Sequence, residues 1–267
     1  MSLKHILFIC ITLFCIQNLS AQILNVEKSR LSSDSVNYFL GSLGLSFNTN
    51  NRSINDDGET VSFIGLTANS DFGYISELHS FLIISQFNYT ATSDDPINST
   101  GYGHFRINFL RKRSISYETY TQVQYDQGRG MEIRWLGGGG FRFRLKKTEK
   151  SSMYAGIGAM YEEETWNYPG PNEAIFTTRI WKSSNYLSGR FKLNDHINLN
   201  LITYYQTGYD FEAEIFRHRV NADLNLLINV TSKLSLQTSA FIGYENEPVV
   251  PISKTIYSIS NGVILSF

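Results

Sequence analysis

Cysteine and proline are scarce in this sequence. The two cysteines, Cys10 and Cys15, both lie in the apolar run over residues 6–16, so disulfides and thiolate chemistry are excluded for the rest of the chain. There are only 5 prolines, whereas glycine reaches 20 residues and aromatic residues make up 14% of the chain. Because aromatic residues favour strands and proline interrupts them, this composition favours an all-β protein.

No charge of one sign dominates, and long hydrophobic runs are also absent. The chain has 23 Lys and Arg against 24 Asp and Glu, a formal net charge of -1, which gives no general reason to expect a nucleic-acid partner. After residue 21, no apolar run approaches the ~20 residues that a membrane-spanning helix needs. A membrane protein of the helical kind is therefore excluded.

The N-terminal residues predict export. Lys4 and His5 precede the apolar run over residues 6–16, and the small residue Ala21 follows it. A basic start, a short apolar run and a small residue at the cleavage position are typical of a secretory signal peptide. We therefore expect residues 1–21 to be removed, residues 22–35 to form a periplasmic N-terminal segment, and residues 36–267 to form one domain.

Apolar and polar residues alternate with a period of two along almost the whole of this domain, which is the strand pattern. Residues 216–230 show it most clearly, since Phe216 and Val220 fall on one face while Arg217 and Arg219 fall on the other. A uniformly apolar face opposite a charged one suits a barrel with lipid outside and a polar lumen inside.

Twelve segments of this kind are predicted, over residues 37–49, 60–75, 80–92, 101–111, 115–126, 131–146, 152–164, 175–192, 196–210, 215–230, 233–246 and 254–267. Every second connection is short, and the others tend to be longer or richer in Asn, Asp, Gly and Pro. On the faces assigned to lipid, aromatic residues gather near the strand ends. Together these features predict a transmembrane antiparallel up-and-down β-barrel of about twelve strands, with both termini on the periplasmic, short-turn side.

Several sequence stretches carry a family resemblance. They are "ILNVEKSRL" after the signal peptide, "YTQVQYD" from Tyr120, "FRFRLKKTEK" from Phe141, "YAGIGAMYEEE", "LSGRFKLNDHINLNLITYYQ" and the ending "TIYSISNGVILSF". These resemble the domain-of-unknown-function 481 proteins of Gram-negative bacteria, in particular the Bacteroidetes branch. The resemblance implies an outer-membrane barrel of unassigned role, and it assigns no functional residues.

The charged residues of the polar faces are expected to meet in the lumen, towards the long-loop rim. Hairpin counting sets Asp210 opposite Arg217, Arg219 opposite Glu245, and Arg134 across from Glu164. The predicted lumen charge cluster comprises Glu132, Arg134, Glu162, Glu164, Asp210, Arg217, Arg219 and Glu245. Such a cluster could orient polar solutes in a pore. Alternatively, the same pairs could satisfy buried charges and hold a narrow barrel together.

Catalytic, cofactor and metal sites are not expected. The glycine run over residues 137–140 lacks the spacing and the following helix of a phosphate-binding loop; instead, Gly138 and Gly140 are expected to face the lumen beside Gly156 and Gly158. His218 is the one histidine expected on the lipid face, and the neighbouring outward positions offer no Ser or Asn partner for it. No His or carboxylate residues have metal-ligand spacing apart from the run over residues 162–164, and there the strand pattern turns Glu163 away and leaves only two carboxylates on one face. The chain is therefore predicted not to be an enzyme.

The C-terminal residues "SNGVILSF" alternate like a strand and resemble the signal read by the bacterial barrel-assembly machinery, through Ser260, Gly262, Leu265 and Phe267. We expect this strand to pair with the first strand and to close the barrel, because lipid tolerates no open sheet edge.

The function that follows is an outer-membrane barrel of unassigned role, with a narrow passive pore for small polar solutes as the leading hypothesis. The alternative is a closed structural or surface-interaction barrel, and a lipid-modifying enzyme is third. The expected location is the bacterial outer membrane. The expected partners are outer-membrane lipids, the barrel-assembly machinery and a small polar solute, with no nucleic acid.

Overall fold

A computed structural model describes the chain except for residues 1–36, 54–59, 93–95, 168–173, 232 and 266–267. The expected signal peptide and the segment over residues 22–35 lie outside the described residues. The elements are β1 (Tyr38–Ser53), β2 (Thr60–Ile75), β3 (Ser80–Thr92), β4 (Pro96–Phe109), β5 (Ile115–Asp126), the short 3-10 helix η1 (Gln127–Arg129), β6 (Met131–Lys147), β7 (Ser151–Asn167), β8 (Ile175–Lys192), β9 (Ile197–Asp210), β10 (Ile215–Asn229), β11 (Leu234–Glu245) and β12 (Thr255–Leu265).

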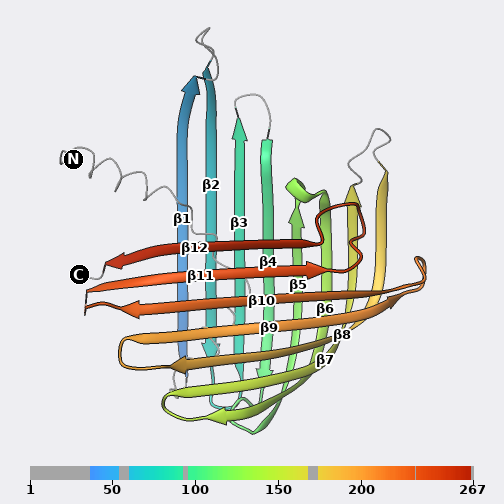
Figure 1. The fold of residues 1–267 in the computed structure, drawn as a ribbon. Helices are drawn as coiled ribbons and strands as arrows, with labels where there is room; N and C mark the ends of the chain where they lie inside the picture. The colour runs from blue at the N-terminus through green and yellow to red at the C-terminus, as the bar shows by residue number, and fades with distance from the viewer. Residues whose placement is uncertain (1–36, 54–59, 93–95, 168–173, 232, 266–267) are drawn as a thin grey trace, which may run out of the picture.

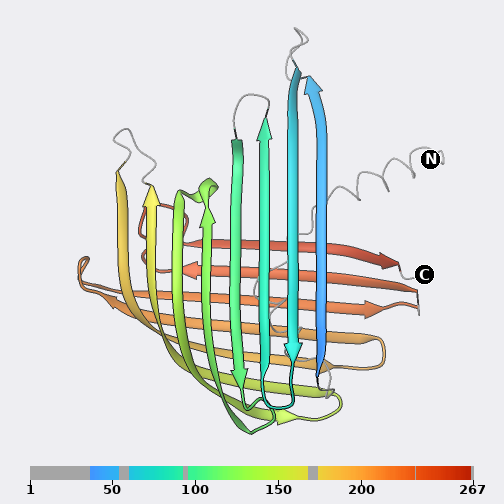
Figure 2. The same ribbon diagram turned by 180° about the vertical axis from the view of Figure 1, so that it is seen from behind.

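The strands form one twelve-stranded sheet in which each strand pairs antiparallel with the next one along the chain. This confirms the predicted all-β, up-and-down architecture. Figures 1 and 2 show how the sheet curls: β1–β4 make one wall, β9–β12 make the facing wall, and the curved strands β5–β8 join the two. The strands of the facing walls run crosswise, as the accumulated twist of a long sheet requires.

The seam between the two ends of the sheet is not hydrogen-bonded. Within the described residues, β1 pairs only with β2 and β12 pairs only with β11. The predicted pairing of the last strand with the first is therefore not formed. The reason is geometrical, since β12 crosses the direction of β1 instead of running alongside it (Figure 1).

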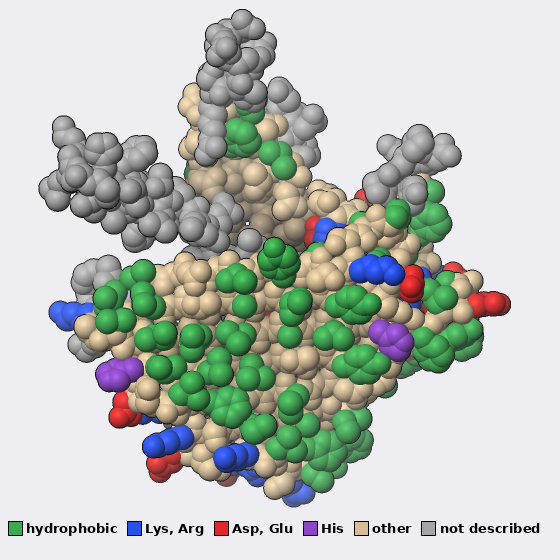
Figure 3. All heavy atoms as spheres, in the orientation of Figure 1, with side chains coloured by type: hydrophobic (Ala, Val, Ile, Leu, Met, Phe, Trp, Pro, Cys, Tyr) green, Lys and Arg blue, Asp and Glu red, His purple; other side chains and the backbone are tan. Residues whose placement is uncertain are grey.

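The two faces of the sheet differ sharply in polarity, as the period-two pattern predicts. Outward side chains are large and apolar, with Trp181 70% exposed and Phe216 60% exposed, whereas the inward side chains Glu162 and Arg219 are 2% and 7% exposed. Figure 3 shows hydrophobic side chains spread over one wall, with charged side chains towards its margins. No helix in the described residues is long and apolar enough to cross a membrane.

The strand bounds agree with the prediction to within a few residues, except at β4. This strand begins at Pro96, whereas the sequence places its start at residue 101 because "SDDPINST" is rich in turn residues. In the structure a bulge between Thr90 and Ala91 of β3 shifts the register, so that Ala91 pairs with Pro96. Proline is tolerated there because it is the first residue of the strand.

The two ends of the sheet differ in their connections. The end called here the short-turn end carries the connections β2–β3, β4–β5, β6–β7, β8–β9 and β10–β11, and the opposite end is called the long-loop end. The contrast is weaker than the sequence suggests, because η1 and the β9–β10 turn at the long-loop end are also brief. Side chains close the short turns: Ser76 accepts a hydrogen bond from the His79 backbone N–H at 2.9 Å, and Thr148 accepts one from Ser151 at 3.0 Å.

Candidate functional site

Six charged side chains of the lumen form an ion network towards the long-loop end. Its members come from five strands and are Arg134, Glu162, Glu164, Lys182, Arg219 and Glu245. Glu162 lies at the centre: it accepts hydrogen bonds from Arg134 Nε at 2.8 Å and Arg219 Nη1 at 2.9 Å, and it also pairs with Lys182. The network thus surrounds one buried carboxylate with three cations.

The other two carboxylates complete the charge balance. Arg219 Nη2 lies 2.8 Å from Glu164 Oε1 and 2.9 Å from Glu245 Oε1. Trp166 Nε1 donates a further hydrogen bond to Glu164 at 3.1 Å. Three carboxylates therefore meet three cations. Because Arg219 belongs to β10 and Glu164 to β7, the contact bridges strands that are not neighbours in the sheet.

The structure brings most members of the predicted cluster together and places one of them elsewhere. Arg219 pairs with Glu245, and Arg134 lies opposite Glu164, as predicted. The prediction that Glu132 faces the lumen is wrong. Glu132 is exposed, because the register of β6 with β7 shifts between Met131 and Ile133. A bulge adds one residue to the strand and so reverses the inward and outward alternation beyond it.

Asp210 and Arg217 meet, but not as the predicted opposite pair. Asp210 lies opposite Ile215, and Arg217 lies opposite Gly208. The guanidinium reaches diagonally, with Nε 2.8 Å from Asp210 Oδ2, which is within reach of a long side chain two residues along the strand. This pair shares no ion pair with the network among the described residues.

The sequence reasoning missed Lys182, although a signal for it exists. Trp181 and Lys182 are adjacent on β8, and Trp181 is the outward residue of the two. Strict alternation therefore turns Lys182 inward, opposite Met160 of β7 and next to Glu162.

Below the ion network, a hydrogen bond spans the lumen. Tyr186 of β8 donates its hydroxyl to Glu118 Oε2 of β5 at 2.8 Å, and we call this pair the crossbar. Arg142 of β6 lies beside it, with Nε 3.6 Å from Glu118 Oε1 and its guanidinium 3.5 Å from the ring centre of Tyr154. The contact between Tyr186 and Glu118 does not follow from hairpin register, because β5 and β8 are not neighbours, whereas Arg142 contacts side chains of the two strands next to β6.

Glycines make room for the crossbar. A Cβ on Gly156 would lie 2.0 Å from the ring of Tyr186, and one on Gly138 would lie 2.8 Å from the hydroxyl of Tyr120. Gly140 and Gly158 pair as predicted, with their backbones in close approach, whereas Gly156 lies opposite Arg142. The glycine patch, which comprises Gly138, Gly140, Gly156 and Gly158, therefore leaves room for tyrosine side chains.

A cavity of about 500 Å³ lies between the crossbar and the long-loop end. Its wall combines amides, tyrosines and the network cations Arg134 and Arg219. The amide side chains are Gln86, Asn88, Gln122, Gln124, Gln206 and Asn221, and the aromatic ones include Tyr102, Tyr120, Tyr204 and Trp166. At its base, Arg106 Nη2 donates to the hydroxyl of Tyr204 at 3.4 Å, again between strands on facing walls. We call this space the long-loop cavity.

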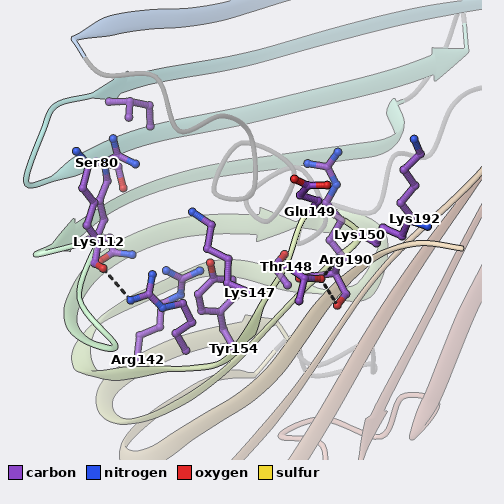
Figure 4. Close-up of a pocket in the computed structure, with 16 residues that line it drawn as sticks. Ser80, Lys112, Arg142, Lys147, Thr148, Glu149, Lys150, Tyr154, Arg190 and Lys192 are labelled. Carbon is purple, nitrogen blue, oxygen red and sulfur yellow. Dashed lines mark hydrogen bonds between the residues drawn. The ribbon is translucent and has the colours of Figure 1, made fainter. Parts of the chain in front are cut away.

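A second cavity, of about 520 Å³, lies at the short-turn end and is called the short-turn cavity. Figure 4 shows its lining residues. Eight of them are basic: Arg111, Lys112, Arg142, Arg144, Lys147, Lys150, Arg190 and Lys192. Among the described residues that line it, Glu149 is the one carboxylate. Lys192 also donates to Asp195 at 2.7 Å, and this hydrogen bond lowers the pKa of the exposed Asp195 carboxyl.

The proposed assembly signal is only partly described. Ser260 and Gly262 lie in β12, paired with Ser239 and Gln237 of β11. Leu265 is the last residue of that strand, and Phe267 lies outside the described residues. The outward side chains Tyr257, Ile259 and Val263 are all more than half exposed, which agrees with the predicted lipid face.

One family matches the sequence over residues 55–264, and its description is "Protein of unknown function, DUF481". The chain belongs to the DUF481 family. This confirms the resemblance that the sequence stretches predict. No curated protein matches the chain.

A solved structure described as "TodX monoaromatic hydrocarbon channel deltaS2 mutant" is similar to this DUF481 chain, with a TM-score of 0.46 and 9% sequence identity. The similarity covers 89% of this chain and 82% of that one. At this level it supports no statement about function.

The outer face of this DUF481 chain holds His218 in a small polar cluster. Its Nδ1 lies 2.9 Å from the Tyr205 hydroxyl and 3.0 Å from the Thr207 hydroxyl, and the imidazole stacks between Tyr205 and Phe216. The side chain of Asn246 accepts a hydrogen bond from the backbone N–H of His218. Among the described residues, no group of three or more His, Cys, Asp or Glu is arranged to hold a metal ion.

Proposed function

We propose that this chain is an outer-membrane β-barrel that provides a narrow passive path for small polar solutes. The observation that carries the proposal is an apolar outer face around a polar lumen with a cavity towards each end. Only lipid around the sheet gives the exposed apolar face a favourable surround. The location is then the bacterial outer membrane, with both termini in the periplasm.

The crossbar separates the two cavities of this path. The long-loop cavity and the short-turn cavity share no lining residue, and Tyr186 and Glu118 lie between them. A tyrosine hydroxyl on a carboxylate is a contact that side-chain rotation can open and close, whereas the strands β5–β8 around it are held by backbone ladders. The path we propose therefore conducts weakly in the native protein.

A closed structural or surface-interaction barrel is the second candidate. The contacts between Arg219 and Glu164, and between Arg106 and Tyr204, favour it because they tie facing parts of the lumen together. Such contacts serve a barrel that only needs to be rigid. The two candidates differ in whether anything crosses the lumen.

Single-channel conductance of the refolded protein in a planar bilayer separates them. Replacing Tyr186 by Ala removes the crossbar, so Tyr186→Ala is expected to conduct better than the native protein. Tyr161→Ala is the matched control, because Tyr161 lies on the outer face of the neighbouring strand β7. Its conductance is expected to equal that of the native protein.

Folded but silent protein, native and Tyr186→Ala alike, would reject the path and support the closed barrel. Cell fractionation tests the membrane location beforehand, because release of the protein by osmotic shock contradicts it.

The chain lacking Phe267 belongs in the same fractionation experiment. If the assembly machinery reads the C-terminus, less of this variant reaches the outer membrane.

A further inference from the structure

Amide side chains reach the long-loop cavity from all parts of the curled sheet. Gln86 belongs to β3, Gln122 to β5, Gln206 to β9 and Asn221 to β10. These strands belong to the two facing walls and to the curved part that joins them (Figure 1). An amide both donates and accepts hydrogen bonds, as a hydroxyl does, whereas a carboxylate only accepts and a guanidinium only donates. A wall of amides therefore suits a ligand that carries many hydroxyl groups.

Three cations of this wall are already paired with carboxylates of the protein. Arg134 and Arg219 belong to the ion network and both contact Glu162. Lys254 Nζ lies 3.4 Å from Glu247 Oε1. An anionic ligand would have to compete with these carboxylates, whereas an uncharged ligand leaves the ion pairs intact. The charged part of the wall thus favours an uncharged ligand.

A row of aromatic rings lines one side of the cavity. It consists of Tyr102 and His104 of β4 and Tyr120 of β5. The centres of the first two rings lie 6.1 Å apart with 1° between their planes, and those of the second and third lie 6.1 Å apart with 20° between their planes. A sugar ring carries C–H groups on its faces, which an electron-rich aromatic ring attracts, and hydroxyl groups at its edge. Rings and amides together therefore suit a cyclic sugar.

Gln206 has a hydrogen-bond acceptor that the described part of the chain leaves unused. Its Oε1 is buried and has no hydrogen-bond partner there. Its neighbours across the two adjacent strands, Ser184 and Arg219, also line the cavity. A buried acceptor without a donor is costly, and a ligand hydroxyl would supply the donor. An ionised carboxylate cannot, because it has no hydrogen to donate.

The connection between β11 and β12 closes one side of the cavity. It bends back towards the long-loop ends of β6 and β7 (Figure 1), where buried Val250 packs with Met131 and Trp166. Ser253 and Lys254 of the same connection line the cavity. A ligand would therefore contact the protein on several sides, which a small-molecule site requires.

From these observations we propose that the long-loop cavity binds an uncharged mono- or disaccharide. Its volume of about 500 Å³ lies within the range of roughly 300–1,000 Å³ that is usual for small-molecule sites. The proposal rests on the proposed function and deepens it, because it names a class of polar solute for the same lumen. Binding itself, however, does not require that the lumen conduct.

Isothermal titration calorimetry on the purified protein tests the site, with glucose, galactose, maltose and citrate as probes. The detergent should have a polyoxyethylene head group, because a sugar head group would compete. At least one sugar is expected to bind at one saturable site, with an affinity that added salt hardly changes, and citrate is not expected to displace it. Tightest binding of maltose assigns a disaccharide, and tightest binding of glucose or galactose assigns a monosaccharide. If no sugar binds, or if citrate displaces the sugar, the proposal is wrong.

Variants place the site within the lumen. Gln206→Ala is expected to bind the sugar about five- to tenfold more weakly, because it loses one hydrogen bond to the ligand. Gln86→Ala, on the facing wall, is expected to act in the same direction and decides the matter if Gln206→Ala misfolds. Asn185→Ala is the matched control: this amide lies on the outer face of β8 and donates to Ser183 at 2.6 Å. Unchanged sugar binding in the folded cavity variants overturns the proposal.

Conductance and calorimetry together keep the two proposals apart. Sugar binding in a silent barrel would retain the site and reject the path. Conductance without sugar binding would retain the path and reject the site.

Discussion

At the long-loop end of the lumen, the carboxylates of Glu162, Glu164 and Glu245 face three cations, whereas at the short-turn end the described lining of the cavity has eight basic side chains and one carboxylate. The first group is buried and its charges balance, so its charged side chains already bind one another. The second is partly exposed. The charged side chains of the lumen therefore pair with one another at one end, whereas basic side chains predominate in the described lining at the other.

Removing a carboxylate from the ion network at the long-loop end should have the largest effect on stability. Glu162→Gln leaves three buried cations with two carboxylates, so we expect it to lower the free energy of unfolding by about 3–5 kcal/mol. Urea unfolding in lipid vesicles, followed by tryptophan fluorescence, measures this. Glu163→Gln is the matched control: Glu163 is the next residue of β7, points outward and pairs only with exposed Arg179 among the described ion pairs. Equal effects of both substitutions would refute a neutral, tightly coupled network.

Breaking the crossbar, which lies between the two ends, should have an intermediate effect on stability. In Gly156→Ala the added Cβ would lie 2.0 Å from the Tyr186 ring, so the ring must move and the crossbar must break. We expect a loss of about 1–3 kcal/mol in the same unfolding measurement. Gly44→Ala is the control, because a Cβ there meets nothing within 4 Å. If Gly156→Ala is tolerated as well as Gly44→Ala, Tyr186 does not lie on the glycine patch.

Removing charge from the basic end should have the smallest effect on stability. A double variant, Lys147→Gln with Lys150→Gln, changes two exposed side chains at the short-turn end, so we expect its free energy of unfolding to change by less than about 0.5 kcal/mol. A loss comparable to that of Glu162→Gln would mean that these lysines hold the fold together. The contrast between the two ends would then disappear.

The sequence predicts the strands and their faces well because both depend on neighbouring residues. The alternation around Phe216 and Arg217, and the hairpin that sets Arg219 opposite Glu245, need only a local count. The same count fails at Glu132, because a bulge beside Met131 leaves no clear mark in the sequence. One uncounted residue is enough to turn a side chain from the lumen to the outer face.

Contacts across the lumen are outside the reach of such counting. Arg219 reaches Glu162 and Tyr186 reaches Glu118 only because the sheet curls, and curvature depends on the twist of all the strands together. The short-turn cavity is a further example. Its basic residues come from segments far apart in the sequence, so the near-neutral net charge of the whole chain gives no sign that basic side chains gather there.

The adjacent carboxylates Glu162 and Glu163 have a consequence for how the strands find their partners. If β7 slid by one residue against β6, Glu162 would turn towards lipid, and the cations that meet it would stay in the lumen with too few carboxylates. Backbone hydrogen bonds hardly distinguish the two alignments, because each offers a complete ladder. The pairing of cations with carboxylates does distinguish them, because only the native alignment of β7 brings Glu162 to its cations. The ion network therefore selects the native strand alignment during assembly.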